Sequence, residues 1–554
     1  MSAGSSARET SPEQSGASPN ETMPSTPTLS PTSSPSSGVK PTRPEFLVDH
    51  ALPNNPLTSI DIPPGSDMGA FETQPLLSEE YVAADQTSNW TWRKLGVEVL
   101  GLVYKSVPVM TASGFQNVNS LLAVMVLGHI GTKALAAFTL ASMISSLTAL
   151  SPLLGFLTAL DTLCSQAATG AEYPGMPGIY LQRCLLFAGC FMIPVATLWW
   201  NIETVLLYIG QDPEIAAMAA YYQRFQILLI ISGVTFEAVK KFLIAQGRLK
   251  EISAIQIVGT TLGWSFFYLT VINPTTTLGF VGVPVALALS YNLNTILTWL
   301  WFTQVVRQRP GWTGFTWSAF RGWPQIAYLA FPGALSVSAE VVAFDLLTLA
   351  MSYLGPVALA AQSIIMTILQ GGYLLFTGVG VVVGNEVGNH LGAAATYRAR
   401  QSALVGLVAV FCGAVVLSLV LFGGRHQWGL WFNPDPKVNV VVAMVIPLVC
   451  IVYLLQSINL VAAGILRGQG RQRIGAVVNL VSYYAVAVPA GFVMIYFLRW
   501  GFVSLWFAVV LAVLCSTLGA LAVVLQSDWH NEVNRCQARL ADDSRMATMV
   551  ATGA

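Results

Sequence analysis

The chain has 554 residues, of which 54% are hydrophobic and only 10% are charged. Soluble proteins of this length carry far more charge, so the composition excludes an ordinary water-soluble protein and indicates one that lies mostly in a lipid bilayer. Its 27 basic and 27 acidic residues give a formal net charge of zero, which offers no electrostatic attraction for nucleic acid. The seven cysteines show no CxxC spacing, so we expect no zinc site and no bound cofactor.

Polar and apolar residues separate clearly along the chain. Residues 1–92 are rich in Ser, Pro and Thr, a composition typical of a disordered tail. Residues 527–554 are predicted to form a polar C-terminal tail. Between the tails lie twelve apolar segments long enough to cross a bilayer, near residues 98–127, 134–160, 178–200, 215–243, 253–272, 281–306, 325–353, 357–382, 402–423, 439–465, 475–497 and 502–526. The sequence therefore predicts an all-α polytopic membrane protein with twelve transmembrane helices.

Basic residues in the loops indicate how these segments are oriented. The loops after segments 2, 4, 6, 8 and 10 contain 13 Lys or Arg residues, whereas the loops on the opposite side contain 4. The positive-inside rule then places both termini in the cytoplasm. Lys105 falls within the first segment, where we expect its amine to snorkel toward the membrane surface.

The chain also contains an internal repeat. The sequence GTKALAAFTLA from Gly131 aligns with GPVALAAQSII from Gly355, and QGRLKEISA from Gln246 aligns with QGRQRIGA from Gln469. Each offset covers six segments, an even number, so both halves keep the same orientation, as in transporters built from parallel repeats. We therefore predict an N-lobe at 93–308 and a C-lobe at 324–526, joined by a cytoplasmic loop at 309–323. Duplication favours transport, although channels and membrane enzymes can also be duplicated.

Two acids, Glu340 and Asp345, lie inside the apolar segment Ile326–Leu354. A carboxylate near the bilayer centre is costly, so it normally faces a water-filled cavity, a partner or a substrate path. Five residues of helix turn by about 500°, so the two side chains point about 140° apart and do not form one clamp. The alternative for each acid is a structural role, in which it only hydrogen-bonds a neighbouring helix.

Several motifs resemble those of the multidrug and toxic compound extrusion (MATE) family, in its eukaryotic, fungal-like branch. The sequence GFLTALDTLCSQA from Gly155 looks like the family's G-x-x-x-A-x-D-T-L-x-x-Q-A signature at the end of helix 2. QDP from Gln211 resembles the turn before helix 4, and VGNHLGA from Val387 resembles the V-G-N-x-L-G-A run after helix 8. LRGQG from Leu466 and SYY from Ser482 are similar to two further elements, so that the resemblance covers residues 96–530.

The resemblance implies roles for individual residues. Glu340 and Asp345 fall on the E-x-x-x-[FY]-E element of helix 7, and Gln456 stands where the animal branch usually has an acid in helix 10. These three residues are the candidates for proton coupling and substrate binding. The candidate cavity-lining residues are Gln116, Asn119, Tyr373 and Tyr484. The motif residues that either satisfy backbone groups at helix ends or take part in gating are Asp161, Thr162, Gln166 and Asn389.

These observations predict a secondary active antiporter, not an enzyme. We expect a monomer that exports small organic compounds, often cationic or amphipathic, such as xenobiotics or secondary metabolites. Export would be driven by a transmembrane H⁺ gradient, with Na⁺ as the alternative coupling ion. A lipid or lipid-linked-sugar flippase of related architecture is the alternative function, and few basic residues within the segments argue against it. An uptake carrier of the major facilitator type would need a basic loop after segment 2, and AATGAEYPGMPG is not one.

The N-terminal tail contains one targeting motif. Glu72, Leu76 and Leu77 have the [DE]xxxL[LI] spacing of an acidic dileucine sorting signal, which a sorting adaptor could bind in a flexible cytoplasmic tail. Such a short pattern also arises by accident. We therefore expect either the vacuolar membrane or the plasma membrane.

Overall fold

A computed structural model describes residues 92–551 except 274–277, 307–310, 313, 353–354, 433–434 and 498–500. These residues all belong to one compact unit, Asn54–Ala554, and a second unit, Met1–Pro53, lies wholly outside them. The proposed sorting residues Glu72, Leu76 and Leu77 also lie outside the described residues. All regular secondary structure in the described part of the chain is helical, as the sequence predicts.

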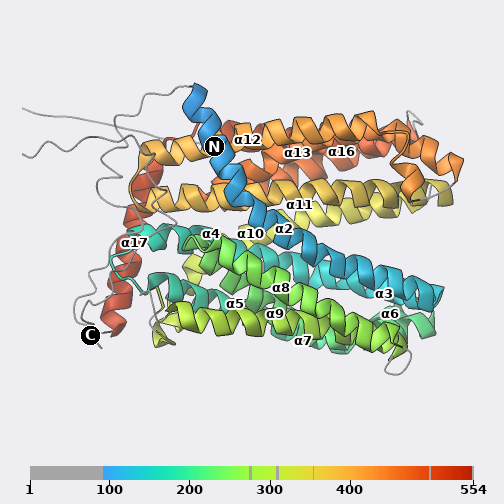
Figure 1. Ribbon diagram of the computed structural model, residues 1–554, viewed down its shortest axis with the longest axis horizontal. Helices are drawn as coiled ribbons and strands as arrows, with labels where there is room; N and C mark the ends of the chain where they lie inside the picture. Colours follow the sequence, from blue (N-terminus) through green and yellow to red (C-terminus); the bar gives the residue numbers. More distant parts are fainter. Residues whose placement is uncertain are drawn as a thin grey trace, which may run out of the picture. The chain divides into compact units, whose positions relative to one another are not determined.

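The first half of the helical bundle, which we call the N-lobe, corresponds to the predicted segments 1–6. Its elements are α2 (Trp92–Ile130), α3 (Thr132–Ser145), η2 (Ser146–Leu150), α4 (Ser151–Gly170), α5 (Met176–Trp200), α6 (Ile202–Tyr208), α7 (Pro213–Ala245), α8 (Leu249–Phe267), η3 (Tyr268–Ile272), η4 (Gly279–Val281) and α9 (Gly282–Val306). In Figure 1, α5, α7, α8 and α9 lie together as one layer of this lobe.

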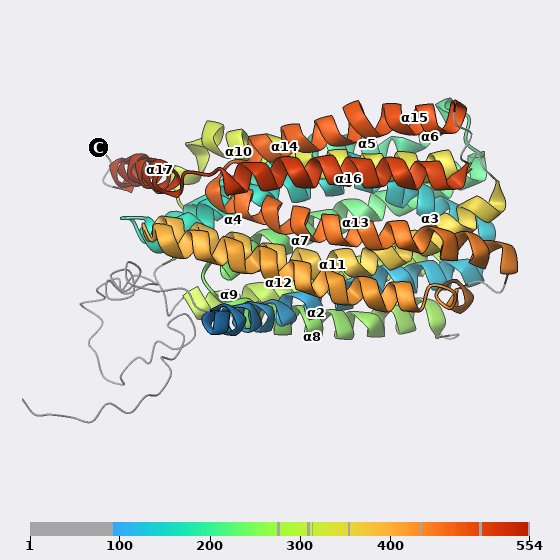
Figure 2. The same cartoon turned by 90° about the horizontal axis from the view of Figure 1, so that it is seen from above.

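The second half, the C-lobe, corresponds to segments 7–12 and is joined to the N-lobe by a loop that contains η5 (Trp317–Phe320). Its elements are α10 (Trp323–Ser352), α11 (Pro356–Gly392), α12 (Thr396–Gly423), η6 (Gly429–Trp431), α13 (Pro436–Gln469), α14 (Gln472–Leu480), η7 (Val481–Ala487), α15 (Val488–Tyr496) and α16 (Phe502–Leu525). Figure 2 shows α16 lying along this lobe beside α13 and α15, which it contacts.

Eleven helices of the described residues are long and apolar enough to cross a membrane. They match eleven of the twelve predicted segments. The fourth segment corresponds to α7, a helix of 33 residues that is not among the eleven, and its sequence is interrupted by the charged residues Arg224, Glu237, Lys240 and Lys241. The α7 helix nevertheless packs within the N-lobe against α3, α5 and α9.

The internal repeat appears as equivalent helix ends. Gly131 and Gly355 are the residues that precede α3 and α11, and both have positive φ. Gly247 and Gly470, which follow α7 and α13, have φ of 78° and 77°. Left-handed backbone is strained for residues with a Cβ atom, so glycine at both places keeps the same turn in the two halves.

The predicted polar C-terminal tail contains a helix. Residues Trp529–Ala551 form the helix α17, which Figure 1 draws across the ends of both lobes. We use α17 to name the two ends of the bundle: the α17 end and the opposite end. The helices α4, α10, α11 and α13 each have one terminus at the α17 end.

Candidate functional site

The intramembrane acid Glu340 on α10 forms a direct hydrogen bond with Gln456 on α13. The Nε2 atom of Gln456 donates to the Glu340 carboxylate at 2.7 Å. Gln456 is buried, with 4% of its surface exposed, and Glu340 is half-buried. The two helices thus bring together the acid and the amide that the sequence singled out, although 116 residues separate them. Only one member of this pair can carry a proton.

Tyrosines surround this pair. Tyr373 of α11 and Tyr483 of η7 are close enough to the Glu340 carboxyl group to interact with it electrostatically. Tyr483 is 3% exposed, and its hydroxyl group has no hydrogen-bond partner among the described residues. The hydroxyl of Tyr484 donates to the backbone carbonyl of Ala339 at 3.2 Å. Tyr483 and Tyr484 both belong to the π-helical η7, a type of helical turn that is frequent at functional sites.

An apolar cavity of about 420 Å³ begins one turn of α10 from Glu340, at Ala343 and Phe344. Glu340, Gln456, Tyr373 and Tyr484 are not among its lining residues. Phe344 and Tyr483, whose rings are 6.4 Å apart, form part of its wall. Its lining comes from the last turns of α10, from η7 and α15, and from the first half of α16, so it extends from the level of Glu340 toward the opposite end. The other lining residues include Ala343, Leu347, Gly491, Phe492, Leu505, Ala508 and Ala512.

Asp345 occupies a different face of α10. Phe344 and Leu346 on either side of it line the cavity, whereas Asp345 does not. This agrees with the predicted angle of about 140° between the side chains of Glu340 and Asp345. At that angle the two carboxylates cannot bind one ligand from the same side. Its carboxylate oxygen Oδ2 is buried and has no hydrogen-bond partner within the described residues. Asp345 therefore does not share the Glu340 environment.

The predicted N-lobe residues lie in a separate, uncharged network. Gln256 donates to Gln116 at 2.6 Å, and Gln116 donates to the hydroxyl of Tyr291 at 3.3 Å. The indole of Trp264 donates to Asn119 at 3.0 Å. Gln116, Asn119, Gln256 and Tyr291 line a space of about 10 Å³, room for about one water molecule. Gln116 and Asn119 thus do line a pocket, but one far smaller than the C-lobe cavity and without an acid among its lining residues.

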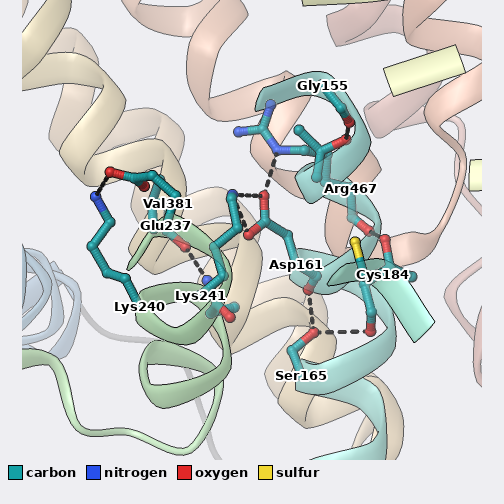
Figure 3. A network of polar contacts seen from close by, with 12 residues as sticks. Gly155, Asp161, Ser165, Cys184, Glu237, Lys240, Lys241, Val381 and Arg467 are labelled. Carbon is teal, nitrogen blue, oxygen red and sulfur yellow. Dashed lines mark hydrogen bonds and ion pairs between the residues drawn. The ribbon is translucent and has the colours of Figure 1, made fainter. Parts of the chain in front are cut away.

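The motif residue Asp161 forms an ion-pair network between three helices (Figure 3). Both of its carboxylate oxygens accept from Lys241 of α7, at 2.7 and 2.8 Å, and Arg467 of α13 lies 3.5 Å away. Asp161 lies inside α4 and only 4% of its surface is exposed. The interpretation of Asp161 as a helix-end cap is therefore wrong, because its partners are side chains of other helices.

The other motif residues connect the two lobes. Thr162 donates to the backbone carbonyl of Arg467, and Gln166 donates to the carbonyl of Gly468 at 2.8 Å. The carbonyl of Asn389 accepts from Thr169 at 2.6 Å. All of these bonds join α4 of the N-lobe to α11 or α13 of the C-lobe. These four motif residues consequently lie in the contact between the lobes and not in the cavity beside Glu340.

Lys105 was expected to snorkel, and this expectation is wrong. Its amine pairs with Glu386 of α11 at 2.6 Å, and both side chains are half-buried. Nearby, Gln401 of α12 donates to Glu98 of α2. A buried amine close to an acid of the other lobe gains more from that partner than from reaching the surface. The pair adds a second contact between the lobes, between α2 and α11.

The helices, the repeat and the half-buried intramembrane acid Glu340 define a two-lobed, multi-pass integral membrane transporter. Comparisons with known proteins then give the family. The sequence model of the MatE family matches residues 108–269 and 332–493, one match in each lobe. The chain therefore belongs to the MatE family, whose members are transporters and not enzymes.

Individual relatives agree with this assignment. An uncharacterized transporter of Schizosaccharomyces pombe is 33% identical over 85% of this chain and 86% of its own length. Protein DETOXIFICATION 16 of Arabidopsis thaliana is 30% identical over 81% of this chain and 92% of its own. Among solved structures, the eukaryotic MATE transporter AtDTX14 superposes with a TM-score of 0.72 at 24% identity, covering 80% of this chain and 99% of that one. This last likeness shows the fold.

Proposed function

We propose that this transporter exports organic, often cationic or amphipathic, compounds in exchange for protons. The observation that carries the proposal is the hydrogen bond between Glu340 and Gln456, which lies one turn of α10 from the cavity-lining residues Ala343 and Phe344. A carboxylate in such a place can bind either a proton or an organic cation, but not both. The apolar wall beside it suits the hydrocarbon part of the same compound.

Competition for Glu340 would couple the two movements. A cation that reaches the site replaces the proton on the carboxylate, and a proton that arrives from the other side displaces the cation. Because Gln456 cannot carry a proton, the Glu340 pair exchanges one proton for one positive charge. The lobes would alternate between the two sides of the membrane around this site, with Asp161, Thr162, Gln166 and Asn389 in the contact that must open and close.

The lining of the cavity favours this function over lipid or lipid-linked-sugar flipping. A flippase has to accommodate phosphate, which requires basic side chains. The fifteen residues that line the cavity contain no Lys, Arg or His. The acid Glu340, one helical turn from the lining residue Ala343, favours positive charge, so organic cations remain the better substrates.

We further propose that the α17 end faces the cytoplasm. Arg398, Arg400, Arg471 and Arg473 are all at this end, as the positive-inside rule requires. The opposite end, toward which the cavity extends, would then face the vacuolar lumen or the cell exterior. Replacing Leu76 and Leu77 together by alanine tests the vacuolar address: a tagged protein whose distribution stays the same has no sorting signal there.

The decisive test of coupling is the variant Glu340→Gln, which keeps the size and hydrogen bonding of the side chain but removes its charge. Uptake of a fluorescent organic cation is measured in proteoliposomes with a pH gradient. We expect gradient-driven uptake to disappear in Glu340→Gln and to be reduced only mildly in the matched variant Asp345→Asn. Full uptake by Glu340→Gln at equal protein content would contradict the proposal.

A further inference from the structure

The C-terminal helix α17 is amphipathic. Val533, Cys536 and Leu540 lie three or four residues apart and are at most 8% exposed, so they form one apolar face of the helix. Asp528 begins the helix by accepting from the backbone N–H groups of His530 and Asn531. Two acids of the helix, Glu532 and Asp543, are also buried, at 4% and 1% exposure. Burying carboxylates is costly unless they have partners, so the helix must dock in one defined place.

The first half of α17 binds the C-lobe. Glu532 lies 3.6 Å from Arg471, at the start of α14. The side chain of Gln537 donates to the backbone carbonyl of Gly392, at the end of α11, at 2.7 Å. Because α17 also follows α16 directly in the chain, this half is fixed to the C-lobe both covalently and by side chains.

The second half of α17 reaches the N-lobe. Arg539 donates to Gln166 of α4 at 3.1 Å, so it meets one of the motif residues that already connect the lobes. The carboxylate of Asp543 accepts from the hydroxyl of Tyr180 of α5 and from Gln325 of α10 at 2.6 Å. One buried carboxylate is thus shared between the two lobes.

The apolar face of α17 covers the point where the lobes meet. The backbones of Gly170, at the end of α4, and Gly392, at the end of α11, approach so closely that neither position has room for a Cβ atom. Leu540 of α17 lies against Gly170. The lobes cannot separate here without removing α17 from at least one of them.

From these contacts we infer that α17 is a latch that holds the α17 end of the transporter closed, and that its second half must leave the N-lobe before this end can open. The inference rests on the alternating access of the proposed function, but not on the coupling ion or the substrate. Its contacts with the C-lobe are compatible with either state, since they join parts of one lobe. Its contacts through Arg539 and Asp543 exist only when the lobes are together.

A cysteine introduced at position 540 reports this release. Leu540 is 3% exposed and lies against Gly170 of the N-lobe, whereas the native Cys536 belongs to the half of α17 that stays on the C-lobe. While α17 is docked, the thiol of Leu540→Cys should react slowly with a maleimide, which needs an accessible thiolate. Labelling at position 540 is assigned by peptide mass spectrometry, because the described part of the chain has seven native free cysteines.

Asp543→Ala removes the carboxylate shared by the lobes, and Asp542→Ala makes the same change on the exposed face of the helix. We expect Asp543→Ala to speed the labelling of Leu540→Cys by at least about tenfold, because the variant loses the hydrogen bonds from both Tyr180 and Gln325 to a charged group. Asp542→Ala should leave the labelling rate unchanged. Equal rates in the two variants would contradict the latch.

A second measurement follows the lobes themselves. Spin labels at Lys250→Cys on α8 and Arg400→Cys on α12, both exposed near the α17 end, report the distance between the lobes when the native cysteines are replaced. Truncation after Asp528, or Asp543→Ala, should raise the population with the longer distance. An unchanged distance distribution in the truncated protein would overturn the inference. Because no substrate is needed, this result is independent of the Glu340→Gln test.

Discussion

The hydrogen bond from Gln456 to Glu340 should set the pH at which the transporter binds its substrate. Gln456→Met removes the donor while keeping a side chain of similar length in a position that is only 4% exposed. The donor stabilises the ionised carboxylate, so its loss favours the protonated form and the carboxylate should ionise only at higher pH. A hydrogen bond to a charged group contributes about 1.5–3 kcal/mol, and about 1.4 kcal/mol corresponds to one pH unit.

We therefore expect the pH midpoint of substrate binding to rise by about one to two pH units in Gln456→Met. The assay is the apparent KM for a fluorescent organic cation in proteoliposomes at a series of pH values, since the cation needs the ionised carboxylate. Asp345→Asn is the control: Asp345 lies on another face of α10 and takes no part in the bond between Glu340 and Gln456, so this variant should leave the midpoint where it is. A midpoint that stays the same or falls in Gln456→Met would refute the assigned role of this bond.

Two further predictions concern the cavity and the ion-pair network. Ala508→Phe adds a ring to the wall of the 420 Å³ cavity. It should raise the KM for bulky cations about tenfold and leave the KM for a small quaternary ammonium ion unchanged. An equal rise for both ions would show that the cavity does not hold the substrate. Lys241→Met leaves the buried Asp161 with Arg467 alone at 3.5 Å and should destabilise the protein by about 3 kcal/mol, measured as a loss of thermal stability in detergent. Adding Asp161→Asn should restore part of that stability, and a double variant less stable than Lys241→Met would contradict the pairing.

Membrane insertion explains why so much of the fold was predictable from the sequence. In a bilayer each crossing segment must satisfy its own backbone hydrogen bonds, so long apolar segments become helices. Helix ends are equally local: Asp212 accepts from the N–H groups of Glu214 and Ile215 at the start of α7, and Pro213 needs no partner there. The repeat was also visible, because glycine is required at the same turn in both halves.

The C-terminal helix could have been predicted but was not. Its polar composition suggested a tail, whereas the spacing of Val533, Cys536 and Leu540 is the pattern of an amphipathic helix. Tyr483, whose unpartnered hydroxyl lies near Glu340, was likewise only one letter of a family motif. In both cases the sequence contains the residues, but it does not show which residues of other helices they contact.

The sequence by itself determined the number and type of segments, the duplication and the acid Glu340, because these depend on local apolarity and on the cost of charge in lipid. Only the tertiary structure decided the partners: Glu340 with Gln456, Lys105 with Glu386, Asp161 with Lys241 and Asp543 with Tyr180. These pairs lie 80 to 363 residues apart in the chain. Each depends on which faces of two helices pack together, and that choice follows from the fit of their side chains across the whole bundle, which no local pattern contains.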